Sequence, residues 1–175
     1  IVDNCQKRPQ RLFKEEELSV DECADYLSQA IEVLRRRNPD VRFVITVSPI
    51  RYAKYGYHGS QLSKSTLLLA ADLIVRKYNC CTYFPAYEIV NDELRDYRFY
   101  SEDMLHPSQQ AVGYIWERFV ETFFSEDAKQ YIAEWKPLKE ALGHRPFNPD
   151  SEEHKSFMEK TNHKIEEFKK KWNIQ

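Results

Sequence analysis

The stretch that decides the fold begins with Val41-Arg-Phe-Val-Ile-Thr-Val-Ser48 and ends with Cys80-Cys-Thr-Tyr-Phe84. Both runs hold β-branched and aromatic residues, both are closed by a proline, and each is typical of a short buried strand. Between them lies a helical pattern that starts at Ser63 or Ser65 and ends at Asn79. Its apolar residues cover most of its circumference, so we expect a deeply packed helix. A strand, a helix and a strand within about forty residues predict a βαβ unit with parallel strands and a right-handed crossover.

A further helix is predicted on either side of this unit. The first runs from Ser19 to Arg37, because Ser19 is followed three residues later by Glu22, and this spacing is that of a capping box. The second is an amphipathic helix that starts at Pro107, since proline is favoured in the first turn of a helix. Residues 87–105, which precede it, are typical of an irregular segment or a broken helix.

The last part of the chain has a different pattern. Gly143-His-Arg-Pro-Phe-Asn-Pro149 separates two helical stretches, and the second carries one apolar stripe opposite many Lys and Glu residues. We therefore expect two regions, which are an α/β part over residues 1–135 and a helical extension over residues 136–175.

The composition excludes several classes of protein. Lys and Arg number 26 and Asp and Glu number 28, a net charge of −2, so we expect no nucleic-acid partner and no binding to an anionic membrane. No run of about 18 apolar residues occurs, and this excludes a membrane-spanning helix. The chain has 4 glycines, whereas average usage would give roughly 12. This shortage argues against a glycine-rich phosphate loop.

The cysteines give no sign of a metal or redox centre. Cys5, Cys23, Cys80 and Cys81 lack the two-residue spacing of zinc and redox motifs, so we expect reduced thiols, no metal and no cofactor. The adjacent pair is interpreted as strand core rather than as a redox pair. Reduced thiols favour a cytoplasmic location, and an export signal upstream of the sequence stays open.

The most informative motif for chemistry is Asp103-Met-Leu-His106-Pro107. Two intervening residues place a carboxylate and an imidazole on one side of a single turn. The carboxylate can then accept a hydrogen bond from Nδ1–H and leave Nε2 free as a general base. The motif follows the last predicted strand, where α/β proteins place their sites. The alternative is that Asp103 caps a helix and His106 is an ordinary exposed residue.

Other residues are weaker candidates. Tyr55, Tyr57 and His58 lie in an aromatic loop and could line a substrate such as a carbohydrate, although exposed loop residues of these types are common. Arg95 and Arg98 stand among acidic residues, and they are expected either to form a salt-bridge network around the catalytic loop or to bind an anionic substrate group.

Several separated motifs resemble those of one family. Asp103-x-x-His106-Pro107 looks like the final block of the SGNH/GDSL hydrolases. The wider set of motifs resembles those of the GSCFA-domain family, an SGNH-like bacterial group. In chain order these motifs are Asn4-Cys-Gln-Lys7, Thr46-Val-Ser-Pro-Ile50, Ser63-Lys-Ser-Thr66, Tyr83-Phe-Pro-Ala-Tyr-Glu88, Asp92-Glu-Leu-Arg-Asp-Tyr-Arg-Phe-Tyr-Ser-Glu-Asp-Met-Leu-His-Pro107 and His144-Arg-Pro-Phe147.

The resemblance covers roughly residues 1–150 and implies both a fold and an activity. The implied fold is a flavodoxin-like three-layer α/β/α fold, here with an incomplete parallel sheet and a C-terminal helical extension. The implied activity is hydrolysis of an ester, with acylated carbohydrate as one candidate substrate. By this resemblance His106 is the base, Asp103 is its orienting carboxylate, and Asn4 is an oxyanion donor. Asn4 as the cap of a turn is the alternative.

The sequence departs from the family at one place. The Gly-Ser-Cys-Phe-Ala block that carries the serine nucleophile is absent, and the serines present have no nucleophile-elbow context. We expect that block upstream of Ile1, so that the chain is a C-terminal portion that is inactive alone. An exposed sheet edge would then favour self-association. The alternative function is a non-catalytic ligand- or partner-binding domain.

Overall fold

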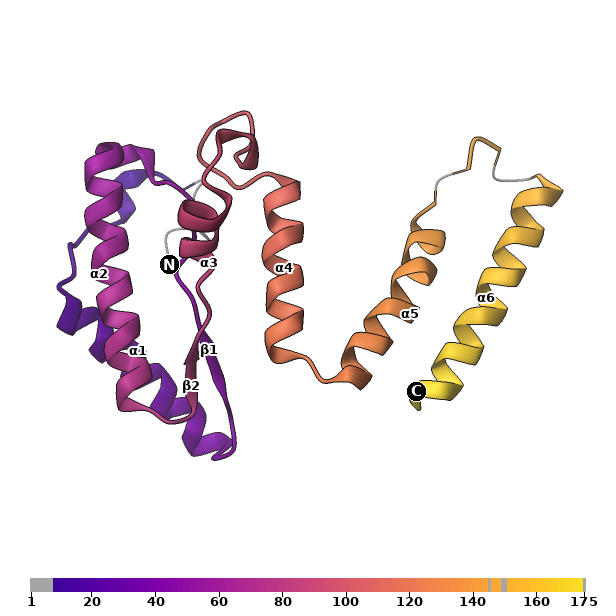
Figure 1. The fold of residues 1–175 in the computed structure, drawn as a ribbon, viewed down its shortest axis with the longest axis horizontal. Helices are drawn as coiled ribbons and strands as arrows, with labels where there is room; N and C mark the ends of the chain where they lie inside the picture. The colour runs from indigo at the N-terminus through magenta and orange to yellow at the C-terminus, as the bar shows by residue number, and fades with distance from the viewer. Residues whose placement is uncertain (1–7, 145, 149–150, 175) are drawn as a thin grey trace. The chain divides into compact units, whose positions relative to one another are not determined.

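The computed structural model describes residues 8–144, 146–148 and 151–174 (Figure 1). It divides into two units, Ile1–Ile115 and Trp116–Gln175. The predicted boundary at residue 135 stays a prediction. Each unit is described by itself below.

The first unit contains the predicted βαβ arrangement. A short turn, η2 (Gln10–Leu12), precedes the helix α1 (Val20–Arg37), and the order then runs β1 (Phe43–Ile45), η3 (Ala53–Tyr55), α2 (Gly56–Lys77) and β2 (Cys81–Tyr83) (Figure 1). The two strands are parallel, with Phe43 opposite Cys81 and Ile45 opposite Tyr83. The βαβ prediction is therefore confirmed, although each strand is only three residues long.

The start of α1 is the capping box that the sequence predicts. The Glu22 amide donates to the Ser19 hydroxyl at 3.3 Å, and the Ser19 amide donates to the Glu22 carboxylate at 2.8 Å. These two bonds satisfy amide groups that the first turn of a helix cannot pair. The helix ends at Arg37 as expected, before Asn38.

The start of α2 is predicted wrongly. The helix begins at Gly56, not at Ser63 or Ser65, and so includes much of the predicted aromatic loop. Its first turns are held by Ser60, a buried residue whose hydroxyl accepts the Tyr52 amide at 3.0 Å. The Ser65 hydroxyl donates to the carbonyl of Gln61, four residues back, as a serine inside a helix does.

The core of the first unit lies between α1, α2 and β2. Ala24 and Ile31 of α1 and Ala70 and Ile74 of α2 are buried with Cys81 of β2. Burial raises the pKa of the Cys81 thiol to about 11, so this cysteine is strand core, as expected. The other side of α2 is not deeply packed, since it exposes the apolar residues Leu62, Leu67, Leu69 and Leu73.

The expectation of a flavodoxin-like three-layer α/β/α fold is wrong. The described residues are mostly helical, and their sheet is a single pair of short parallel strands. A three-layer fold needs a sheet broad enough to separate two layers of helices, and two strands of three residues do not form one. Each strand pairs on one side only within the described residues, so self-association through a sheet edge stays a prediction.

The segment after β2 is a broken helix, as predicted. It consists of α3 (Ala86–Glu88), the π-helical turn η4 (Ile89–Leu94) and the turn η5 (Tyr97–Phe99), and it leads to α4 (Gln109–Phe123). Pro107 is not the first residue of that helix. The Ser108 hydroxyl accepts the Ala111 amide at 3.3 Å, so Pro107 precedes the cap and pairs with Tyr100 in an isolated β-bridge.

The second unit is helical. Beyond the end of α4 it contains α5 (Glu126–Gly143) and α6 (Glu152–Trp172) (Figure 1). Leu138 of α5 is buried with Ile165 and Phe168 of α6, and aromatic rings surround them. The Trp172 indole also donates to the Glu134 carboxylate at 3.1 Å. The apolar stripe predicted for the last helix is thus the face that packs on α5.

Candidate active site

The Asp103–His106 pair lies in the loop between η5 and α4. The imidazole Nδ1 is 2.5 Å from Asp103 Oδ2, the contact that the spacing of the two residues predicts. An ionised carboxylate only accepts hydrogen bonds, so Nδ1 is the donor in this contact. In the neutral imidazole Nε2 then carries the lone pair. The side chain of His106 is 57% exposed and that of Asp103 is 45% exposed. The pair is therefore open to solvent.

Backbone groups fix the carboxylate of Asp103. Its Oδ1 accepts the amide of Leu105 at 2.9 Å and the amide of His106 at 3.0 Å. These two bonds, and then the bond from the imidazole, lower the pKa of Asp103 to about 2. Asp103 is thus ionised across the physiological range. It is not the helix cap that the alternative interpretation supposed, because Ser108 has that position.

The loop is a tight hydrogen-bonded turn. The Met104 amide donates to the Ser101 carbonyl at 2.9 Å, and the Ser101 amide donates to the His106 carbonyl at 2.8 Å. Met104 has a φ of 58°, in the left-handed region that side chains rarely occupy. This local reversal of the chain lets two successive amides converge on Asp103. The cost of the conformation is of the order of 1 kcal/mol, and the surrounding bonds offset it.

Arg51, which was not among the predicted site residues, lies in the segment after β1 and anchors this loop. Its amide donates to the Leu105 carbonyl at 3.0 Å and its guanidinium donates to the Met104 carbonyl at 3.4 Å. The guanidinium lies 4.1 Å from the ring centre of Tyr100 and within 6 Å of those of Tyr57 and Tyr97. The sequence signal that could have indicated Arg51 is an arginine that shortly follows a predicted strand and stands next to Tyr52.

The loop lies at the carboxyl end of the sheet. Arg51 follows β1, the Asp103–His106 loop follows β2, and the two segments are joined by the bonds described above. These two segments start from adjacent strand ends, because the Phe84 amide after β2 donates to the Ile45 carbonyl of β1 at 2.8 Å. The position is the one that α/β proteins use for binding sites.

The other predicted site residues separate into two places. Tyr57 is 62% exposed and lies under the Arg51 guanidinium, beside the Asp103–His106 loop. Tyr55 instead donates its hydroxyl to Glu15 at 2.8 Å and lines a different cavity. His58 is exposed in the first turn of α2. Asn4 lies outside the described residues.

The two arginines that follow η4 have different environments. Arg98 is 4.0 Å from Asp96 and lies over the ring of Phe99. Arg95 forms no ion pair with any residue that the structure describes, and it lines a pocket of about 180 Å³ together with Arg51. The predicted salt-bridge network therefore consists of one pair, and Arg95 is not part of it.

Most of the serines that sequence analysis considered are engaged with the backbone. The hydroxyls of Ser48 and Ser60 accept backbone amides, and those of Ser65 and Ser101 donate to carbonyls. Ser101 lies close to the pair in sequence, but its hydroxyl donates to the Pro107 carbonyl at 3.2 Å. None of these hydroxyls is positioned by the imidazole of His106 in the described structure.

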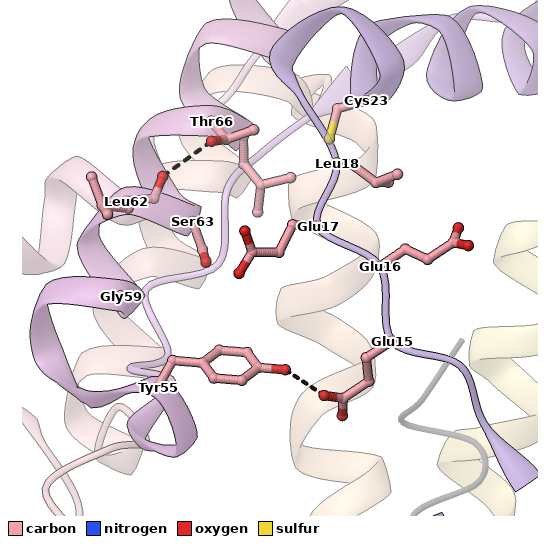
Figure 2. A pocket seen from close by; sticks show the side chains of 11 residues that line it. Glu15, Glu16, Glu17, Leu18, Cys23, Tyr55, Gly59, Leu62, Ser63 and Thr66 are labelled. Atoms are coloured by element: carbon pink, nitrogen blue, oxygen red, sulfur yellow. Dashed lines mark hydrogen bonds between the residues drawn. The ribbon is translucent and has the colours of Figure 1, made fainter. Parts of the chain in front are cut away.

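A second cavity, of about 530 Å³, lies between residues 15–18 and the first turns of α2 (Figure 2). Figure 2 shows the ring of Tyr55 reaching across to Glu15, while Glu17 and Ser63 point into the space. Leu62 and Leu67 supply apolar walls. Sequence analysis missed this cavity, because residues 15–17 have the pattern of a solvated charge cluster.

Within the described parts of the chain, no three His, Cys, Asp or Glu side chains gather closely enough to hold a metal ion. No described helix has a stretch sufficiently long and apolar to traverse a bilayer.

Comparison with known proteins gives the family. The model of the GSCFA family matches residues 1–119, and the model of the GSCFA domain protein, C-terminal domain, matches residues 135–175. A search of curated proteins and a search of solved structures gave no match. The first match includes the Asp103–His106 loop, Arg51 and both strands. Because it extends over more than half of the sequence, the chain belongs to the GSCFA family.

Proposed function

We propose that this chain supplies the histidine base and the orienting aspartate of an ester hydrolase. The observation that carries the proposal is the 2.5 Å contact between His106 Nδ1 and a carboxylate that two backbone amides already hold. A base needs a fixed tautomer and an accessible lone pair, and the loop supplies both. The resemblance of the Asp103-x-x-His106 block to that of the serine ester hydrolases supports the reaction class.

The chemistry follows from the state of the pair. His106 Nε2 takes the proton of the attacking hydroxyl as the oxygen forms its bond to the ester carbonyl carbon. Asp103, ionised, then stabilises the imidazolium through Nδ1–H. The imidazolium returns the proton to the leaving alcohol, and the same two groups activate water to cleave the acyl intermediate. The proposal assigns the nucleophile to no described residue.

An acylated carbohydrate is the proposed substrate class. Tyr57 and Tyr97 are 62% and 66% exposed, and both rings lie close to the Arg51 guanidinium that anchors the loop. Exposed rings beside a base provide flat apolar faces on which a sugar ring can pack. The proposal places the alcohol part of the ester on these rings, and the contacts of Arg51 with both rings and with the loop support it.

The test uses the natural protein that contains this sequence and short p-nitrophenyl esters. His106→Ala should lower kcat about 10²- to 10⁴-fold, the contribution typical of a general base. The matched control is His163→Ala, because His163 is also an exposed histidine near a carboxylate, at 3.4 Å from Glu167. Hydrolysis that survives His106→Ala at the full rate would sink the assignment. No hydrolysis by the natural protein would favour the non-catalytic binding domain.

A further inference from the structure

We infer that the pocket beside the Asp103–His106 loop binds an oxyanion, a carboxylate or phosphate group carried by the ester substrate. The inference rests on the proposed function for its role in catalysis, but the pocket's binding of an anion can be tested alone. The pocket is lined by Arg51, Val90, Asn91, Arg95, Asp96, Tyr97 and Tyr100.

The charges in the pocket favour an anion. Arg51 and Arg95 both line it and each carries a positive charge, and Asp96 is the one carboxylate among its lining residues. Asp96 already accepts the Arg98 amide at 2.8 Å and has the Arg98 side chain at 4.0 Å. Neither Arg51 nor Arg95 forms an ion pair with a described residue. Two guanidinium groups without carboxylate partners are a typical arrangement for carboxylate or phosphate recognition.

Side-chain contacts hold Arg51, and a backbone turn fixes the position of Arg95. The Arg51 guanidinium lies over the ring of Tyr100, 4.1 Å from its centre, and one of its N–H groups donates to the Met104 carbonyl. Its other N–H groups can therefore donate to a ligand. Arg95 follows the π-helical turn η4 with a φ of 42°, and its amide donates to the Val90 carbonyl at 3.1 Å. This left-handed residue turns the chain at the rim of the pocket.

The size of the pocket sets the kind of ligand. Its volume is about 180 Å³, below the roughly 300–1,000 Å³ of sites that enclose a whole small molecule. It therefore suits one charged group of a larger substrate. Arg51 belongs both to the pocket and to the anchor of the loop, so a substrate held there by its anion lies next to the base.

The first experiment measures binding to the protein itself. Benzoate and phenyl phosphate are titrated while the backbone amide NMR signals of Asn91, Arg95 and Tyr97 are followed, with benzamide as the neutral isostere of benzoate. At least one anion should shift these signals, and benzamide should not. Which anion binds more tightly distinguishes a carboxylate site from a phosphate site. Equal shifts with benzamide, or no shift with either anion, would overturn the inference.

The variants test which arginine is responsible. Arg95→Gln should weaken anion binding about tenfold, which corresponds to the roughly 1.4 kcal/mol of one charge-assisted hydrogen bond. Arg37→Gln is the matched control, because it removes the same charge from an exposed position at the end of α1 that does not line the pocket. Equal weakening in both variants would show a diffuse effect of charge and overturn the site. Arg51 is left intact because it also anchors the loop.

The second experiment connects the pocket to catalysis in the natural protein. The values of kcat/KM for 4-acetoxybenzoate and for 4-acetoxyphenyl phosphate are each divided by the value for neutral 4-acetoxybenzamide. For the anion that binds, this ratio should exceed one. Arg95→Gln should lower that ratio about tenfold through KM. Binding of an anion without any hydrolysis would support the anion pocket and contradict the proposed function. Hydrolysis without preference for either anion would support the proposed function and contradict a role of the pocket in substrate binding.

Discussion

Among the residues that the structure describes, two histidine–carboxylate pairs have the spacing of one helical turn, and they differ in the contacts that hold the carboxylate. His163 Nε2 lies 3.4 Å from Glu167 on the exposed side of α6. His106 Nδ1 lies 2.5 Å from Asp103, and the carboxylate also accepts two backbone amides. Both pairs are exposed, so burial does not distinguish them. The difference is the fixed carboxylate, and it is this that makes one pair a candidate for catalysis.

The largest expected effect comes from removing the charge of that carboxylate. Asp103→Asn should lower kcat of the natural protein about 10²- to 10⁴-fold, because an amide no longer selects the Nδ1–H tautomer or stabilises the imidazolium. Glu167→Gln, the same change in the other pair, should leave kcat within twofold. Rates on a p-nitrophenyl ester check both. If the two variants behaved alike, the two pairs would not differ in function.

The next effect comes from releasing the loop. Arg51→Ala should lower the free energy of unfolding by about 1–2 kcal/mol, since it removes a charged hydrogen bond and the stacking on Tyr100. Arg51→Lys should restore only part of the lost stability, because an ammonium group is not planar and cannot stack on the Tyr100 ring as a guanidinium does. Urea unfolding measures the loss. In ester kinetics the fall should be mainly in kcat, because the base is misplaced.

The contact between Asp103 and His106 could be predicted from the sequence, but the anchoring of their loop by Arg51 could not. The Asp-x-x-His spacing predicts the contact because it depends on three consecutive peptide units. The capping box of Ser19 and Glu22 predicts the start of α1 for the same reason. Arg51 acts on Met104 across 53 positions, and no local pattern records that contact.

The errors in the fold have the same origin. The sequence predicts a helix that begins at Ser63 or Ser65, because serine is a frequent cap. The helix begins earlier, at Gly56, and its first turns include Ser60, whose contact with the Tyr52 amide depends on packing. The three-layer fold was inferred from the family resemblance rather than from these residues. The number of strands that pair in a sheet depends on contacts between distant segments, and two short runs could not decide it.

A smaller effect is expected at the left-handed residue of the loop. Met104→Val should destabilise the protein by about 1–2 kcal/mol, because a β-branched side chain is strained at a φ of 58°. Met104→Gly should be close to neutral, since relief of strain offsets the larger entropy of the unfolded chain. Met158→Val, inside α6, is the control and should cost only a few tenths of a kcal/mol. Thermal or urea unfolding compares the three variants.

The smallest expected effect is a loss of stability at acidic pH. The pKa of Asp103 is lowered to about 2 from an ordinary 3.8, so its contribution to stability is complete above about pH 4 and is lost as the pH falls towards 2. The wild type should therefore lose more stability between pH 5 and pH 2 than Asp103→Asn does. Unfolding measured at both pH values tests this, and a carboxyl ¹³C titration of Asp103 should give a midpoint near 2. A midpoint near 4 would mean that the amide bonds do not hold the carboxylate.

The contact between Arg51 and the loop also has a consequence for the order of folding. Closing a segment of 53 residues costs chain entropy, and the contact can repay it only after α2 has brought β1 and β2 together. We expect the turn around Asp103 to form locally and its attachment to Arg51 to be among the last steps of folding. In hydrogen exchange, the Arg51 amide, bonded to the Leu105 carbonyl, should therefore open more readily than the amides of the strand pair.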